Sequence, residues 1–161
     1  EWFSNDIAQA NKENIFIFVH FPLWNKKYSR TKKTYNDFWM KEIHPLLVKY
    51  EVKAVFGAHM HSYGPTEKID GISYFITGEG GAELIKWYKD HGGTHHFMYI
   101  TVNGNKFSYK IITKDRELEE SEADVTKNII YARNNSKNAF IDYEKVTLNK
   151  KESFIINRNY R

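Results

Sequence analysis

Three histidines stand where the chain is predicted to leave a buried strand. His20 follows the apolar run 15–19, and His59 and His61 follow the apolar run 52–56. Ligands collect at the carboxyl ends of strands in α/β sheets, and a neutral imidazole is a common metal ligand. A His-x-His pair leaving a strand can aim both rings at one small volume. We therefore treat these histidines as candidate metal ligands, with ordinary surface or hydrogen-bonded histidines as the alternative.

The residues after the His59–His61 pair and the length of the chain separate it from two metal-dependent families. Metallo-β-lactamase-like hydrolases need His-x-His-x-Asp-His, whereas Tyr63 and Gly64 occupy the last two places here. Amidohydrolases also begin with His-x-His after a strand, but they are barrels of roughly 250 residues, and this chain has 161. Because the sequence contains no cysteine, thiolate nucleophiles and cysteine-held zinc are excluded. Any metal must be held by histidines, carboxylates or amides.

Helices and strands are expected to alternate around the histidines. Apolar residues at helical spacing predict a helix over residues 2–10 and another over residues 36–49. Pro45 should kink the second helix or divide it in two, because proline lacks the N–H that a helix interior requires. The β-branched and aromatic runs 15–19 and 52–56 predict strands buried on both faces. These elements would bring the candidate ligands to one edge of a sheet.

The rest of the chain is expected to add hairpins and a tail. Asp70-Gly71 predicts a hairpin turn before a strand over residues 73–77, and Asn103-Gly104-Asn105 predicts the turn of a final hairpin. Six acidic residues between 115 and 124 predict a solvated connector, either helical or disordered. Weak alternation over residues 127–161 predicts a small antiparallel appendage.

Three blocks of sequence resemble the calcineurin-like metallophosphoesterases, and more narrowly their purple-acid-phosphatase-like members. The blocks are Val-His-Phe-Pro-Leu-Trp at 19–24, Val-Phe-Gly-Ala-His-Met-His-Ser-Tyr at 55–63, and Asp-Gly-Ile-Ser-Tyr-Phe-Ile-Thr-Gly-Glu-Gly-Gly-Ala at 70–82. The resemblance implies an α/β fold, with the C-terminal half of a two-sheet sandwich flanked by helices over residues 1–113. Residues 114–161 then form the acidic connector and appendage, and match nothing in the family.

The resemblance also implies a dinuclear centre of two divalent or trivalent metal ions (Mn, Fe or Zn). In the family, such a centre activates a water or hydroxide for attack on phosphomonoesters or phosphodiesters. By matching position, His20 and His59 would bind one metal ion and His61 the other. The family's Asp-x-His, Gly-Asp-x-x-Asp and Gly-Asn-His blocks, which carry the bridging carboxylate and the acid histidine, are absent from this sequence. We expect them upstream of residue 1.

The chain is therefore expected to be the C-terminal half of a phosphoesterase and to be inactive alone. Its partners would be a phosphate-ester substrate and the missing N-terminal half of the same domain. One alternative is a non-catalytic binding domain that retains the fold, with which Ala58 in place of the family's glycine is compatible. Another is an independent three-histidine zinc site with a fourth position open to water.

Three features bear on the possible partners and location of the protein: its apolar runs, its net charge and the family resemblance. No apolar run approaches the ~20 residues that span a bilayer, and a net charge of +4 over 161 residues is a weak argument for nucleic acid. Purple-acid-phosphatase-like relatives are often exported, which favours an extracytoplasmic or secreted location.

Other polar groups have plainer interpretations. The glycine-rich loop 78–81 could cradle a phosphate, but a tight connection between strands is favoured because no Gly-Lys-Ser/Thr follows. The basic loop 26–33 could attract phosphate or simply be solvated. His95 and His96 are expected to be structural or rim residues at the start of the final hairpin. His44 is expected to be exposed on its helix.

Overall fold

A computed structural model describes residues 1–24, 33–64, 66–84, 86, 93–123, 146–148 and 152–154. Most of the basic loop 26–33 and most of the tail lie outside the described residues. The chain divides into two compact units, the first made of Glu1–His59, Thr66–Ile76 and Val102–Phe107. The other described residues form the second unit. In the described part of the chain, no helix is both long and apolar enough to cross a membrane.

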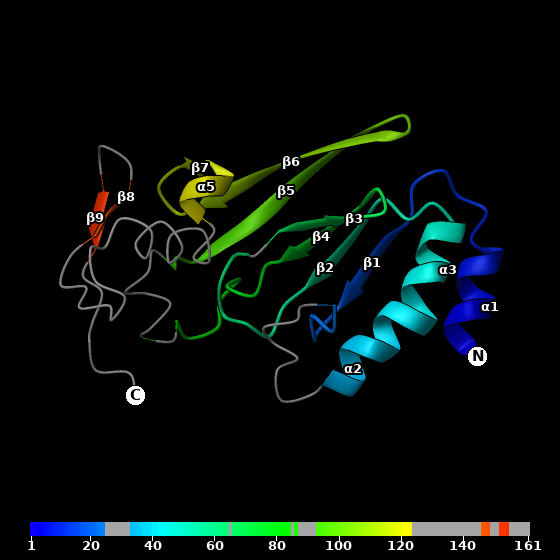
Figure 1. Ribbon diagram of the computed structural model, residues 1–161. Coiled ribbons are helices and arrows are strands. Elements are labelled where there is room, and N and C mark those ends of the chain that lie inside the picture. The colour runs from blue at the N-terminus through cyan, green and yellow to red at the C-terminus, as the bar shows by residue number, and fades with distance from the viewer. Residues whose placement is uncertain are drawn as a thin grey trace. The chain divides into compact units, whose positions relative to one another are not determined.

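The first unit is built on a four-stranded sheet with the strand order β1-β2-β4-β3, seen in Figure 1. Its strands are β1 (Phe16–Val19), β2 (Ala54–Gly57), β3 (Glu67–Ile69) and β4 (Ile72–Ile76). β1 pairs in parallel with β2, and β2 with β4, while β3 is antiparallel to β4. Because Val19 lies opposite Gly57, β1 and β2 end at the same edge of the sheet.

Three phenylalanines form a row across the parallel strands. Phe18, Phe56 and Phe75 are partners in register, and their rings stack with centroids 5.0 and 5.1 Å apart. Phe56 and Phe75 are buried, whereas Phe18 is 75% exposed. The expectation that strand 15–19 is buried on both faces is therefore wrong. The reason is its position: β1 is the end strand of the sheet, with one neighbour among the described strands.

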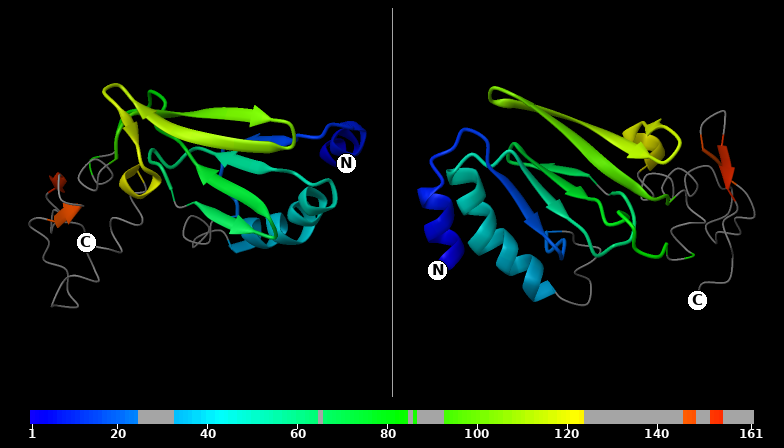
Figure 2. Two further views of the ribbon diagram at one scale, coloured as in Figure 1. Left: turned by 90° about the horizontal axis from the view of Figure 1, so that it is seen from above. Right: turned by 180° about the vertical axis from the view of Figure 1, so that it is seen from behind.

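Helices lie along one face of this sheet, as Figures 1 and 2 show. They are α1 (Trp2–Gln9), α2 (Lys33–Phe38), a π-helical segment η2 (Trp39–Ile43) and α3 (His44–Lys49). The expected interruption before Pro45 is confirmed. In η2 the N–H of His44 donates to the carbonyl of Trp39, five residues back, and this wider turn relieves the clash that a proline ring makes inside an α-helix. In α1 only Ile7 is buried, and Trp2 is 76% exposed, so the apolar face expected there is narrower.

The hairpin between β3 and β4 has the expected Asp-Gly turn. Asp70 and Gly71 have φ angles of 47° and 86°, and Ile69 pairs with Ile72. Two consecutive positive φ angles define the turn type that matches the twist of a two-residue hairpin. The turn therefore fixes the register that places Tyr74 and Phe75 in the sheet.

The second unit contains a three-stranded sheet in the order β5-β6-β7, apart from the hairpin tip Val102–Phe107, which belongs to the first unit. Its elements are β5 (His96–Asn103), β6 (Lys106–Thr113), β7 (Glu117–Leu118) and the short helix α5 (Glu120–Ala123). The final hairpin is confirmed, with Gly104 and Asn105 at its turn and Asn103 still in β5. The acidic connector is more ordered than expected, because Glu117 and Leu118 pair with β6.

The expected fold class is confirmed. The chain is mixed α/β, with a four-stranded and a three-stranded sheet and few helices, an arrangement compatible with part of a phosphoesterase sandwich. Farther along, β8 (Val146–Leu148) and β9 (Glu152–Phe154) pair antiparallel, as expected of the appendage. The domain boundary near residue 113 stays a prediction.

Candidate metal centre

His20 and His59 leave neighbouring strands at the same edge of the first unit's sheet. His20 directly follows β1, and His59 lies two residues beyond the end of β2. The N–H of Ala58 donates to the carbonyl of His20 over 3.0 Å, which extends the pairing of the two chains past the strands. The parallel register thus brings the two histidines together, as the sequence predicts.

The two imidazole rings face each other through their nitrogens. Nε2 of His20 lies 3.1 Å from Nδ1 of His59, and Phe21 packs against the His59 ring with centroids 4.5 Å apart. Two nitrogens bound to one zinc ion at about 2.0–2.1 Å each can lie at most about 4.2 Å apart. The observed separation is that of a hydrogen bond between the two rings, and it also lies within the range that one metal ion could bridge.

The backbone at His59 is held in an uncommon conformation. Its φ angle is +60°, in the left-handed region, which non-glycine residues occupy infrequently, although histidine does so more often than most. Such conformations persist where the surrounding structure fixes them, and they are frequent at functional sites. At this position, the conformation turns the chain directly after β2 and brings Nδ1 towards His20.

A buried tryptophan fixes the turn that carries His20. Trp24 is 1% exposed and packs on Tyr74 with ring centroids 5.0 Å apart. The side-chain amide of Asn36 donates to the carbonyl of Trp24 over 2.6 Å. A Cβ on Gly57 would lie only 2.6 Å from Cη2 of Trp24. Gly57, which lies one position before the glycine of the family pattern, therefore makes room for the Trp24 indole.

His61 belongs to the second unit and has its own hydrogen-bond partner. Its Nδ1 lies 2.8 Å from the backbone carbonyl of Glu83. Since a carbonyl only accepts, Nδ1 carries the proton and Nε2 keeps its lone pair in the neutral ring. A hydrogen bond of this kind behind an imidazole fixes its tautomer and orients it as a ligand. The sequence could not identify Glu83, because a backbone carbonyl has no side-chain signature.

The glycine-rich loop 78–81 opens the segment between the end of β4 at Ile76 and the start of β5 at His96, so the tight connection between strands favoured from the sequence is not what the structure shows. Glu79 is 1% exposed, and its Oε2 accepts the N–H of Thr94 over 2.9 Å. Nδ1 of His95 donates to the Glu79 carbonyl over 3.2 Å. His96 is 5% exposed at the start of β5, which agrees with a structural role. The buried carboxylate in this loop was not singled out from the sequence.

The expectation that His44 is exposed is wrong. His44 is 5% exposed, with Nδ1 2.6 Å from the hydroxyl of Tyr74 and Nε2 3.0 Å from Oδ2 of Asp70. Burial raises the pKa of Tyr74 to about 12, and the negative charge of Asp70 acts in the same direction. His44 therefore connects α3 to β4 and to the turn before it.

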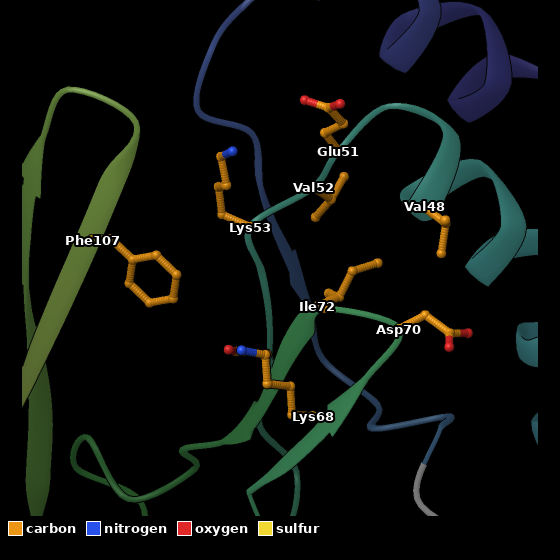
Figure 3. A pocket seen from close by; sticks show the side chains of 10 residues that line it. Val48, Glu51, Val52, Lys53, Lys68, Asp70, Ile72 and Phe107 are labelled. Atoms are coloured by element: carbon orange, nitrogen blue, oxygen red, sulfur yellow. The ribbon is translucent and has the colours of Figure 1, made fainter.

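A cavity in the first unit lies away from the histidine edge. It has a volume of about 330 Å³, and Figure 3 shows its lining side chains. Lys53 directly precedes β2 and Ile72 begins β4, so the cavity lies at the amino ends of strands. Its charged side chains are those of Glu51, Lys53, Lys68 and Asp70. None of the candidate metal ligands lines it.

The three candidate ligands all lie in the described part of the chain. In that part of the chain, no group of three or more His, Cys, Asp or Glu side chains is placed to hold a metal ion. His20 and His59 thus offer two nitrogen donors, and no described side chain is placed as a third ligand beside them. His61 belongs to the second unit.

Comparisons with known proteins point to phosphatases. The chain is 27% identical over 79 residues to purple acid phosphatase 1 of Ipomoea batatas, covering 47% of this chain and 16% of that protein. It is 28% identical over 79 residues to tartrate-resistant acid phosphatase type 5 of Oryctolagus cuniculus, covering 49% and 23%. Purple acid phosphatase 18 of Arabidopsis thaliana is 27% identical over 101 residues, covering 55% and 23%. The chain is similar to purple acid phosphatases over about half its length.

These similarities support a metallophosphoesterase-like relationship and a phosphoesterase-type origin. No protein-family model matches the chain. The matched segment spans less than a quarter of each of these relatives.

Proposed function

We propose that this chain contributes part of the dinuclear metal centre of a phosphoesterase. The observation that carries the proposal is the 3.1 Å separation of His20 Nε2 and His59 Nδ1 in a chain similar to purple acid phosphatases. His20 and His59 would bind one metal ion, and His61 the other. Such a centre supplies Lewis-acid activation of water for attack on a phosphate ester.

The residues of this chain provide and orient the ligands. Pairing of β1 with β2 brings the first two imidazoles together, and Phe21 packs against the His59 ring. The Glu83 carbonyl holds the proton of His61 on Nδ1, so that Nε2 can act as a ligand. Acid–base groups and carboxylate ligands are expected from the rest of the domain, so we propose that this chain alone does not hydrolyse phosphate esters.

The edge of β1 is the proposed contact for the missing part of the domain. β1 ends the described four-stranded sheet, and the row of stacked rings ends there with Phe18, which is 75% exposed. The backbone N–H and C=O groups along the outer side of an end strand can pair with another strand, and an exposed apolar surface marks an interaction site. A strand added beside β1 would continue the row and cover Phe18.

Metal binding to the full chain is the first test. Calorimetric titration with Zn²⁺ and Mn²⁺ should show binding that His20→Ala and His59→Ala each weaken at least about 10-fold. Met60→Leu is the matched control: it changes the same loop without removing a nitrogen ligand, so its affinity should equal that of the unmodified chain. Equal affinities for all four proteins would contradict the proposal and favour a non-catalytic binding domain.

Turnover is tested on the longer protein that contains the upstream ligand blocks. There, His61→Ala should lower kcat for a phosphomonoester or phosphodiester at least about 100-fold, because a metal ligand is lost. Near-normal turnover in that variant would rule out His61 as a ligand.

A further inference from the structure

We propose that Glu79 and His96 are positioning residues for His61: together they hold the glycine-rich loop so that the Glu83 carbonyl keeps the His61 proton on Nδ1. The inference rests on the proposed role of His61 as a metal ligand. The position of the proton on the His61 imidazole can be measured without metal.

Glu79 ties the glycine-rich loop to the chain that enters β5. Its Oε2 accepts the N–H of Thr94 over 2.9 Å, and its carbonyl accepts the N–H of His96 over 3.4 Å. The side chain is buried to 1% exposure, although burying a carboxylate is costly unless it is paired. Oε2 therefore holds the side chain through the Thr94 N–H, whereas Oε1 has no hydrogen-bond partner among the described residues.

His96 connects the same loop to the segment that carries His61. Its Nε2 lies 2.9 Å from the Thr77 hydroxyl, and its Nδ1 lies 3.5 Å from Oε2 of Glu79. Its ring packs edge-on against Tyr63 with centroids 5.5 Å apart. The buried imidazole of His96 therefore contacts Thr77 and Glu79, which flank Gly78. It also contacts Tyr63, which lies two positions after His61.

Two further links join the loop to the neighbours of His61. The N–H of Gly78 donates to the carbonyl of Ser62 over 3.1 Å, and Tyr63 forms an isolated β-bridge with Thr77. The start of the loop is thereby set against the backbone directly after His61. Five residues beyond Gly78, the same loop presents the Glu83 carbonyl to Nδ1 of His61.

The composition of the loop explains why it needs an anchor. Gly78, Gly80 and Gly81 lie within four residues, and glycine loses more conformational freedom on ordering than any other residue. Without a side chain that fixes the loop from within, the Glu83 carbonyl would sample many positions. Glu79 stands between these glycines, and its carboxylate provides the fixed point.

The test is the tautomer of His61 in the metal-free chain, read from long-range ¹H–¹⁵N correlations at about pH 8, where an ordinary imidazole is neutral. The unmodified chain should show His61 mainly as the Nδ1–H form. Glu79→Ala should lower the ratio of Nδ1–H to Nε2–H forms about 2- to 12-fold, the range that corresponds to loss of one hydrogen bond. Glu79→Gln keeps an oxygen for the Thr94 N–H and should restore most of the ratio.

Glu83→Ala is the matched control, because it removes a side chain from the same loop and leaves the carbonyl in place. Its His61 tautomer should be that of the unmodified chain. If Glu79→Ala does not fold, His96→Gln is measured in the same way, with the same expected loss. A folded variant that keeps the Nδ1–H form, or an unmodified chain with the Nε2–H form, overturns the proposal.

Addition of Zn²⁺ to the same labelled samples separates this inference from the proposed function. If the tautomer responds to Glu79→Ala but His61 Nε2 does not respond to Zn²⁺, Glu79 positions the ring and His61 does not bind metal in this chain. If Zn²⁺ shifts His61 Nε2 while the tautomer ignores Glu79→Ala, the metal centre stands and the positioning role is overturned.

Discussion

The indole of Trp24 occupies the space that a side chain on residue 57 would need. A Cβ on Gly57 would lie 2.6 Å from Cη2 and 3.2 Å from Cζ2 of Trp24, and Trp24 is itself buried on Tyr74 and Trp39. The close approach joins the end of β2 to the turn that follows His20. The spacing of the two candidate ligands therefore depends on a glycine that carries no ligand itself.

Gly57→Ala should destabilise the chain and separate His20 from His59. Forcing an extra methyl group into a packed site costs about 1–3 kcal/mol, and here the neighbour is a buried ring that cannot move freely. We expect that loss in the free energy of unfolding, measured by urea denaturation, together with weaker Zn²⁺ binding. Gly80→Ala is the control, since nothing lies within 4 Å of a Cβ there, and it should change stability by no more than about 0.5 kcal/mol.

Alanine substitutions in the stacked phenylalanine row should differ strongly in how much they lower the free energy of unfolding. Phe75 is 1% exposed and Phe18 is 75% exposed, although both stack on Phe56. Phe75→Ala should cost about 3–5 kcal/mol, as for other buried phenylalanines, whereas Phe18→Ala should cost about 0.5 kcal/mol or less. Urea denaturation of the two variants gives the comparison. Similar losses for both would mean that another part of the chain covers Phe18 in solution.

The sequence predicted the elements that local pattern controls. The apolar run before His20 and the Asp70-Gly71 turn gave strands and a hairpin because side-chain alternation and positive φ angles are local properties. The interruption before Pro45 was predicted for the same reason, since the missing N–H of proline acts on its own helix. The approach of His20 to His59 followed from the parallel order expected of such strands.

Contacts between distant segments could not be read from local pattern. The exposure of Phe18 depends on the place of β1 in the sheet, which the strand's own residues do not specify. His44 is buried because Asp70 and Tyr74, 26 and 30 residues later, accept and donate its hydrogen bonds. The Glu83 carbonyl belongs to the backbone, so no residue type marks it.

His44 should contribute to stability through its two hydrogen bonds. His44→Ala removes both and leaves the Tyr74 hydroxyl buried without its imidazole partner, for which a loss of about 1–3 kcal/mol is expected. Asp70→Asn keeps an oxygen acceptor and a residue that tolerates the positive φ of this turn. Because the Asp70 side chain is 70% exposed, Asp70→Asn should lower the free energy of unfolding by less than about 1 kcal/mol. Equal losses would show that the charge of Asp70, rather than the burial of His44, dominates.

Tyr74 should make the stability of the chain fall at alkaline pH. Burial raises its pKa from 10.0 to about 12, so the folded state binds this proton more tightly than the unfolded state does. The stabilisation is complete below pH 10 and is lost as the pH rises towards 12. Tyr74→Phe has no phenol to titrate, so its free energy of unfolding should decline less steeply between pH 10 and 11 than that of the unmodified chain.

Burial and Glu120 raise the pKa of Tyr109 to about 12 as well, so a smaller decline should persist in Tyr74→Phe and weaken further when Tyr109→Phe is added. Parallel declines in all three proteins would show that neither phenol is responsible.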